Sequence, residues 1–249
     1  MTNGEQKNGE QRLRGEGLCK TYGKRPVLRN VTIEVKGGEV VGLLGANGAG
    51  KTTTFSIIIG IIRPDRGKVL YNDEDLTTLP MHQRARKGVT YLPQEPSVFR
   101  KLTVEENILA ILETLPFSAA ERRTRLAQLL SDLHIEHLNT HRADSLSGGE
   151  RRRVEITRAL VLSPSFMLLD EPFAGIDPLS VVDIQEIILQ LRGRGIGVLV
   201  TDHNVRETLS ICDRAYILSD GSVFAEGTPQ ELIASARARQ IYLGERFHL

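Results

Sequence analysis

The stretch Val40–Thr53, VVGLLGANGAGKTT, decides the fold of this 249-residue chain. Val40–Leu44 is a short apolar run of the kind found in buried strands. It leads through a G-x4-G-K-T loop into Lys51–Ile62, for which the pattern predicts a helix. Glycines let successive N–H groups turn toward phosphate oxygens, while Lys51 supplies a charge to the β and γ phosphates and Thr52 a hydroxyl to Mg²⁺. This strand, loop and helix therefore predict an α/β fold with a nucleotide-binding P-loop.

Two acids follow another apolar run. Phe166–Leu169 is followed directly by Asp170 and Glu171. A strand that ends in two acids places them at its carboxyl end, where α/β sheets bind ligands. We expect Asp170 to hold Mg²⁺ or its water, and Glu171 to act as general base on the attacking water. The alternative is an acidic pair on the surface, and the P-loop disfavours it.

Three further polar residues are candidates for the same site. His203 follows the apolar run Ile196–Thr201, and we expect it to contact the γ phosphate, although a lone histidine also serves as a structural donor. Gln94 is neutral and can contact both Mg²⁺ and the attacking water, but its position also fits a plain surface glutamine. Tyr22 is a candidate for stacking on adenine or for a place in the core.

The pentapeptide Leu146–Glu150, LSGGE, indicates a second anion site. Ser147 can cap a helix, and Glu150 three positions later completes a capping box. Gly148 and Gly149 leave backbone N–H groups uncovered at the positive end of the helix dipole. Two anion sites and one nucleotide site in one chain indicate a site assembled from separate pieces.

Composition restricts the kinds of partner. Hydrophobic residues make up 40% of the chain and the formal net charge is +1, so no global positive charge favours nucleic acid. Arg151–Arg153 looks like a nucleic-acid patch, but no aromatic residue interrupts it, and we expect a solvated helix face. Cys19 and Cys212 have no metal-ligand spacing and fit reduced thiols. No apolar run approaches the ~20 residues that span a bilayer, so work on a membrane requires a partner.

The chain divides into three parts. Residues 1–12 repeat the polar sequence NGEQ and predict a disordered tail, and residues 13–249 form the folded domain. Within that domain, residues 103–162 have almost no strand signal. Thr103 and Ser118 begin capping boxes there, and a leucine stripe at helical spacing fits the core. We therefore expect an inserted helical subdomain.

Together these residues closely resemble the nucleotide-binding subunit of ATP-binding cassette (ABC) transporters, from Leu13 onward. The matching motifs occur in the family's order: Walker A at Gly45–Thr52, the Q-loop at Gln94, the signature at Leu146–Glu150, Walker B at Phe166–Glu171, the D-loop at Ala174–Asp177 and the switch histidine at His203. The resemblance implies an α/β P-loop NTPase core with an antiparallel β subdomain and an inserted helical subdomain. It also implies ATP, Mg²⁺ and a head-to-tail homodimer.

The resemblance assigns roles residue by residue. It implies ATP contacts from Tyr22, Gly45, Asn47, Gly48, Ala49, Gly50, Lys51, Thr52 and Thr53, and contacts with the partner's ATP from Ser147, Gly148 and Gly149. It implies Mg²⁺ contacts from Thr52, Gln94 and Asp170, and catalytic roles for Glu171, His203 and Gln94. The signature ends in Glu150 where glutamine is commoner, and the D-loop lacks the usual serine hydroxyl, which leaves the detail of dimer coupling open.

A narrower resemblance, to the ATPases of lipopolysaccharide export transporters, lies in Tyr91–Thr103, Thr201–Leu209 and Ile241–Leu249. It implies a subunit on the cytoplasmic face of the inner membrane of Gram-negative bacteria. Two integral membrane subunits would dock near Gln94, Phe99 and Arg100, unless Phe99 lies in the local core.

Three other functions fit parts of the sequence. The alternative closest to export is the ATPase of a branched-chain amino acid importer. A soluble ABC ATPase acting on DNA or ribosomes is disfavoured because the chain has one cassette and no long heptad run. A nucleotide sensor that does not hydrolyse is disfavoured because Glu171 and His203 are both present.

Overall fold

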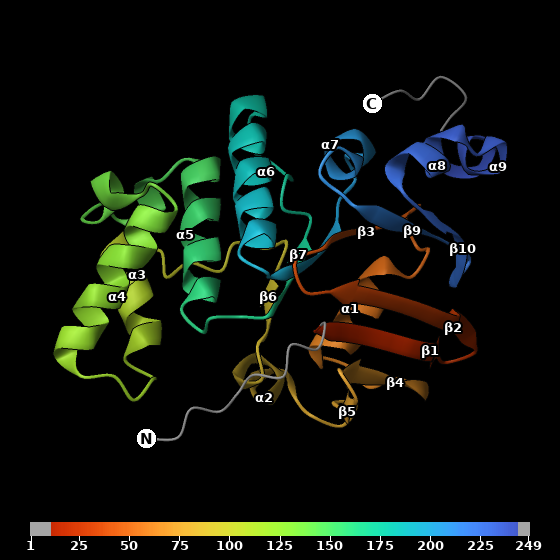
Figure 1. Cartoon of the computed structure of the whole chain (residues 1–249), viewed down its shortest axis with the longest axis horizontal. Coiled ribbons are helices and arrows are strands. Elements are labelled where there is room, and N and C mark those ends of the chain that lie inside the picture. Colours follow the sequence, from red (N-terminus) through yellow and green to blue (C-terminus); the bar gives the residue numbers. More distant parts are fainter. Residues whose placement is uncertain (1–10, 244–249) are drawn as a thin grey trace.

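A six-stranded sheet carries the glycine loop in the computed structural model, which describes residues 11–243 (Figure 1). Its strand order is β10-β9-β3-β8-β7-β6, and all neighbours are parallel except β9 and β10. The strands are β3 (Val40–Gly45), β6 (Val89–Leu92), β7 (Phe166–Asp170), β8 (Gly197–Thr201), β9 (Arg214–Ser219) and β10 (Ser222–Gly227). All five residues of β7 are buried, and Phe166–Leu169 alternate between two cores, as expected for a strand covered on both faces.

The expected antiparallel subdomain is a four-stranded sheet of order β2-β1-β4-β5. It contains β1 (Arg12–Tyr22), β2 (Arg25–Lys36), β4 (Arg66–Tyr71) and β5 (Glu74–Asp75). Buried Val31, Ile33 and Val35 alternate along β2 and share one core with the helix α1 (Lys51–Ile59). The fold class predicted from the sequence is confirmed.

The first helix ends earlier than the sequence pattern predicts. We expected it to continue to Ile62, but α1 stops at Ile59. Gly60 follows with φ 85° and donates its N–H to Ile57 O at 3.2 Å. A glycine in this left-handed conformation closes a helix without steric cost, so the apolar residues after it lie outside the helix.

The remaining helices cover the sheet and form the helical segment. They are α2 (Met81–Arg86), α3 (Val104–Leu112), α4 (Ala119–Asp132), α5 (Gly148–Leu160), α6 (Pro178–Gly193), α7 (Val205–Leu209), α8 (Pro229–Ala234) and α9 (Ala236–Ala238). Helical turns lie at Glu136–Leu138, Ala143–Ser145 and Arg239–Leu243. Helices α3, α4 and α5 lie together at the opposite end of the molecule from the antiparallel sheet (Figure 1).

Capping boxes start the helices of this segment. The side chains of Thr103 and Ser118 accept hydrogen bonds from the backbone N–H groups of Glu106 and Glu121, three residues on. The side chains of Glu106 and Glu121 in turn accept from the backbone N–H groups of Thr103 and Ser118. The leucine stripe packs as expected, with Leu126, Leu130 and Leu133 buried and Leu129 partly buried. A helix start with both bonds of the box is locally stable, so these residues fix where α3 and α4 begin.

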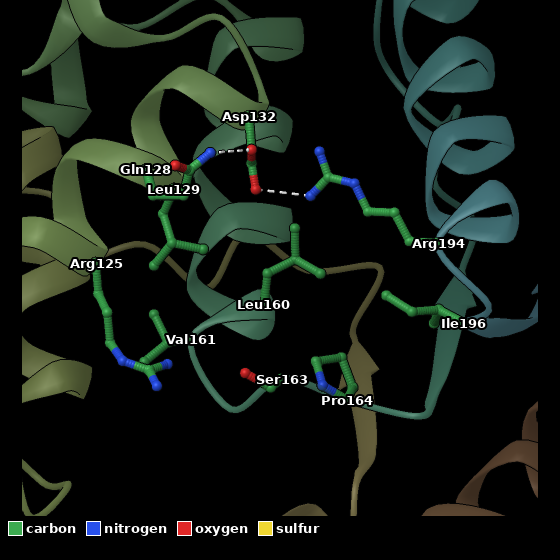
Figure 2. Close-up of a pocket in the computed structure, with 10 residues that line it drawn as sticks. All are labelled: Arg125, Gln128, Leu129, Asp132, Leu160, Val161, Ser163, Pro164, Arg194 and Ile196. Carbon is green, nitrogen blue, oxygen red and sulfur yellow. Dashed lines mark hydrogen bonds and ion pairs between the residues drawn. The ribbon is translucent and has the colours of Figure 1, made fainter.

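A groove of about 250 Å³ marks the junction between the helical segment and the sheet (Figure 2). Apolar side chains from α4, from α5 and from the segment that joins α5 to β7 line it, among them Leu129, Leu160 and Pro164. Asp132 of α4 accepts from Gln128 at 2.8 Å and from Arg194 at 2.6 Å. Since Arg194 follows α6, this ion pair joins the helical segment to the core.

The prediction of a disordered tail over residues 1–12 is wrong for residues 11 and 12. Residues 1–10 lie outside the described residues, but Gln11 O accepts from Gly37 N at 2.8 Å and Arg12 begins β1. Pairing with β2 and β4 therefore orders the chain from residue 11. Within residues 11–243, no helix is both long and apolar enough to cross a bilayer.

Candidate nucleotide-binding site

The glycine loop joins β3 to α1 in a conformation that requires glycine at two positions. Gly45 has φ 149° and Gly50 has φ 109°. A Cβ atom at Gly45 would lie 2.5 Å from Leu218 O, and one at Gly50 would lie 2.5 Å from Leu28 Cδ2. Backbone conformation and close packing therefore both exclude a side chain at these two positions.

Lys51 begins α1, and its side chain lies inside the loop. It is 8% exposed, and Nζ donates to Gly45 O at 2.6 Å and to Ala46 O at 3.2 Å. Burial lowers the pKa of this ammonium, while the carboxylates of Glu171 and Asp170 act in the opposite direction. A positive charge is thus held inside a glycine loop, an arrangement that favours an anion.

A cavity of about 180 Å³ lies beside this loop. Its walls are Asn47, Gly48, Gly50, Lys51, Thr52 and Thr53 from the loop and α1, with Val27, Glu171 and His203. Ala49 is buried in the loop, where its carbonyl oxygen accepts from Gly221 N at 3.2 Å. The structure therefore brings the glycine loop, the acid after β7 and the histidine after β8 to one cavity.

Asp170 ends β7 with 6% of its surface exposed. Burial raises the pKa of its carboxyl group, against the hydrogen bond that the Tyr91 hydroxyl donates to Oδ2 at 3.1 Å. The Asp170 carboxylate and the exposed Thr52 hydroxyl are hard oxygen donors, which suit Mg²⁺. Within residues 11–243 no cluster of three or more acids, histidines or cysteines forms a metal cage. One carboxylate plus substrate phosphates is nevertheless a common way to bind Mg²⁺, so the donor set fits.

Glu171 follows β7 in a strained backbone conformation. Its φ is 47°, and its N–H donates to Thr201 O at 2.7 Å. Oε1 lies 2.7 Å from His203 Nε2, whereas Oε2 is buried without a hydrogen-bond partner in the described part of the chain. Burial raises the pKa of this carboxyl group. Strain of this kind persists at functional sites because the surroundings enforce it.

His203 reaches the cavity because β7 and β8 are parallel neighbours. Asp170 pairs with Thr201, so both strands end at the same edge of the sheet. The His203 side chain is 58% exposed. The buried Asp202 side chain holds the backbone on both sides of His203, because it accepts from Asn204 N at 2.9 Å and from Phe173 N at 3.0 Å.

Other predicted residues lie away from this cavity. Gln94 is exposed and lines a different cavity, of about 330 Å³, with Gly148 and residues of the 174–176 loop. Tyr22 ends β1 with 49% of its surface exposed, which excludes a place in the core. Phe99 is 46% exposed, so it does not lie in the local core either, and Arg100 is exposed beside it.

The signature begins α5 with a complete capping box. Glu150 N donates to Ser147 Oγ at 3.3 Å, and Ser147 N donates to Glu150 Oε2 at 2.8 Å. Gly149 is buried, and a Cβ atom there would lie 2.3 Å from Ser180 Oγ of α6. The sequence pattern assigned both signature glycines to an open anion site, but Gly149 is also required for close packing of α5 on α6.

Arg152 corrects an expectation from the sequence. Arg151–Arg153 was expected to form a solvated helix face, yet Arg152 is 6% exposed. It donates through Nη1 to Pro93 O at 2.8 Å and through Nη2 to Asp170 O at 3.0 Å. Adjacent residues on a helix point about 100° apart, so three consecutive arginines never share one face. The sequence did contain one signal for burial of Arg152: Glu155 lies three residues on, a spacing at which the two side chains can form an ion pair on one helix face.

The comparisons with known proteins agree with this geometry. The family model described as ABC transporter matches residues 28–174. The chain is 60% identical over 237 residues to the lipopolysaccharide export system ATP-binding protein LptB of Acidithiobacillus ferridurans, covering 95% of this chain and 98% of that protein.

Two solved structures are similar throughout. An ATP-binding cassette of an ABC transporter in its ADP conformation superposes with a TM-score of 0.84 at 30% identity, covering 94% of this chain and 99% of that one. A dimeric post-hydrolysis state of another cassette, bound to ADP and Pi, gives 0.76 at 28% identity, covering 87% and 98%. The glycine loop, the two acids, the histidine and the signature lie where these similarities extend, and the chain belongs to the family of ABC transporter ATP-binding proteins.

Proposed function

We propose that this chain is the ATP-hydrolysing subunit of a transporter that extracts lipopolysaccharide from the inner membrane and exports it toward the outer membrane. The observation that carries the proposal is 60% identity to a lipopolysaccharide export ATPase over nearly the whole length of both chains. Family membership alone supports ATP hydrolysis. Only the full-length similarity points to this cargo.

The cavity beside Lys51 supports a role for each residue in hydrolysis. Lys51 would bind the β and γ phosphates, and Thr52 and Asp170 would hold Mg²⁺, which would neutralise phosphate charge. Glu171 orients and deprotonates the attacking water. His203, 2.7 Å from Glu171, holds that carboxylate and contacts the γ phosphate. Gln94 would contact Mg²⁺ and the water only if its loop moved toward the cavity, since it lies outside the cavity in this structure.

The signature supports a nucleotide-sandwich homodimer. Ser147 and Gly149 do not line the cavity beside Lys51 of their own chain. In the proposed dimer the start of α5 faces the γ phosphate held by Lys51 of the second copy, and Tyr22 stacks on adenine. ATP then closes the two copies, and hydrolysis removes the contacts that favoured closure.

The segment after Gln94 supports docking of two integral membrane subunits on the cytoplasmic face. Phe99 is an exposed aromatic side chain, and the Arg158 guanidinium lies 4.6 Å from its ring centroid. Aromatic and arginine side chains are enriched in protein interfaces. The two backbone hydrogen bonds between Phe99 and the buried Asn107 side chain, at 2.9 and 3.1 Å, hold this surface in place.

Affinity purification tests this proposal. The tagged chain, extracted from its own membranes in mild detergent, should carry two integral membrane proteins, and reconstituted vesicles should release lipopolysaccharide only with ATP. Phe99→Glu should lose the membrane proteins, whereas Ile61→Glu, at another exposed apolar side chain, should keep them. Recovery of a periplasmic amino-acid-binding protein instead would identify an importer and end the export proposal.

A further inference from the structure

Arg152 lies between three parts of the proposed catalytic machinery. It is on α5, five residues after Ser147, and its side chain is buried. Its two terminal nitrogens serve different segments: Nη1 donates to Pro93 O at 2.8 Å, beside Gln94, and Nη2 donates to Asp170 O at 3.0 Å and Glu171 O at 3.4 Å. One planar guanidinium thus joins the signature helix, the Gln94 loop and the acids after β7.

The hydrogen bonds from Arg152 to the carbonyl groups of Asp170 and Glu171 lie next to the strained backbone of Glu171. The two carbonyl groups lie on either side of the Glu171 backbone, whose φ is 47°. A non-glycine residue keeps this conformation only when its surroundings enforce it. Fixing both carbonyls limits rotation on both sides of Glu171, and therefore the direction in which its carboxylate points.

The Gln94 loop is held by the same face of α5. Glu155 pairs with Arg152 at 3.1 Å and accepts from Ser97 N at 2.6 Å. Arg158, one turn further on, donates to Ser97 O at 2.6 Å. Residues three apart lie on one helix face, so a small rotation of α5 moves the supports of this loop together.

We propose that Arg152 is a positioning residue that aligns Glu171 and the Gln94 loop with the signature helix. In the dimer this links contact with the partner's nucleotide at Ser147 to the geometry of the chain's own base. The inference rests on the proposed role of Glu171 in hydrolysis. It requires a guanidinium, because the one nitrogen of a lysine cannot serve the Pro93 and Glu171 segments together.

The test must separate positioning from folding. Arg152→Met alone would leave Glu155 as an unpaired buried charge, which is strongly destabilising. We therefore compare Arg152→Met/Glu155→Gln with Glu155→Gln, in which the glutamine oxygen can still accept from Ser97. Arg152→Lys is the second variant, since it keeps the charge. Arg153→Met is the matched control: this neighbouring arginine pairs with Asp183 of α6 and lines no part of the cavity.

Steady-state ATP hydrolysis by the purified chain with Mg²⁺, alongside thermal melting, gives the result. Relative to Glu155→Gln, the double variant should lower kcat by about 10- to 100-fold, the size expected for a misplaced catalytic group. KM should change less than about threefold because the P-loop does not contact Arg152. The kcat of Arg152→Lys should lie between those of the double variant and Glu155→Gln. Arg153→Met should keep the wild-type kcat.

A second background distinguishes this inference from the proposed function. In Glu171→Gln, where the base is already absent, removing Arg152 should cost little further activity. Additive losses, an unchanged kcat in the double variant, or an equal loss in Arg153→Met would overturn the positioning role. If Glu171→Gln itself keeps the wild-type rate, the proposed base is wrong, whatever Arg152 does.

Discussion

The starts of α1 and α5 are both predicted to contact phosphate, but they are built differently. α1 begins after Gly50, which has φ 109° and no side-chain cap, and it is surrounded by Lys51, Glu171 and His203. α5 begins after Ser147 with both bonds of a capping box, outside that cavity. The first helix start has its proposed catalytic groups in the same chain. The second has both capping bonds in its own chain, and in the proposed dimer it contacts the nucleotide of the other chain.

The largest effect is expected from Glu171→Gln, which removes the proposed base beside the start of α1. Loss of the general base should lower hydrolysis by about 100-fold or more, while Lys51 still binds ATP. ATP-bound dimers should therefore accumulate, visible by light scattering after size-exclusion chromatography. Hydrolysis at the wild-type rate would show that Glu171 is not the base.

The pH dependence of hydrolysis tests the same carboxylate. Burial raises the pKa of Glu171 above its usual value of 4.5, and only the ionised form accepts a proton from water. The rate should therefore fall as pH decreases through that raised pKa, and recover as pH increases. The acid limb of kcat, followed in buffers of constant ionic strength, should be absent from the residual activity of Glu171→Gln. An identical limb in that variant would assign it to another group.

Ser147→Arg changes the start of α5, the proposed contact with the partner's nucleotide. A large cation at the start of α5 should leave ATP binding at the P-loop intact but weaken ATP-dependent dimerisation by about tenfold or more, roughly 1.4 kcal/mol. Ala127→Arg, which adds the same side chain to the exposed face of α4, is the control. Binding of a fluorescent ATP analogue and sedimentation with ATP measure the two steps. Normal dimerisation of Ser147→Arg would refute the composite site.

The difference between the two helix starts also shows what sequence patterns predict. Local sequence signals were sufficient where a segment determines its own structure. The apolar run Val40–Leu44 forms β3, and the three predicted capping boxes start α3, α4 and α5. β1 was not predicted, because register shifts between Gly15 and Leu18 break the alternation of buried side chains.

Tertiary contacts explain what the sequence could not predict at the site. The cavity groups Lys51, Glu171 and His203, which the motifs had indicated. Neither the burial of Arg152 nor the displacement of Gln94 from that cavity follows from a local pattern, since both depend on how α5 lies against the end of β7. The close packing of Gly149 against Ser180 is likewise not visible in the sequence, because it depends on how α5 lies against α6.

Gly149→Ala separates packing from phosphate contact in the signature. Its Cβ would lie 2.6 Å from Ser180 Cβ, whereas the nearest atom to a Cβ at Gly148 is Ile176 Cγ2 at 3.2 Å. Overpacking should destabilise Gly149→Ala by about 1–3 kcal/mol, which lowers Tm by about 2–4 °C for each kcal/mol in a chain of this size. Gly148→Ala should lower Tm less. Equal melting temperatures would show that α5 and α6 separate easily.

The smallest effect on stability is expected from the removal of single helix caps, and it tests the proposed role of α5 most directly. Ser147→Ala and Thr103→Ala each remove one N-cap hydroxyl from a capping box, at the starts of α5 and α3. Both should lose about 1 kcal/mol of unfolding free energy, because the local structures are equivalent. Only Ser147→Ala should also weaken ATP-dependent dimerisation and hydrolysis, since only α5 is proposed to meet the partner's nucleotide. If the two variants lose activity equally, Ser147 acts as a helix cap alone, and the proposed contact between the start of α5 and the partner's nucleotide is wrong.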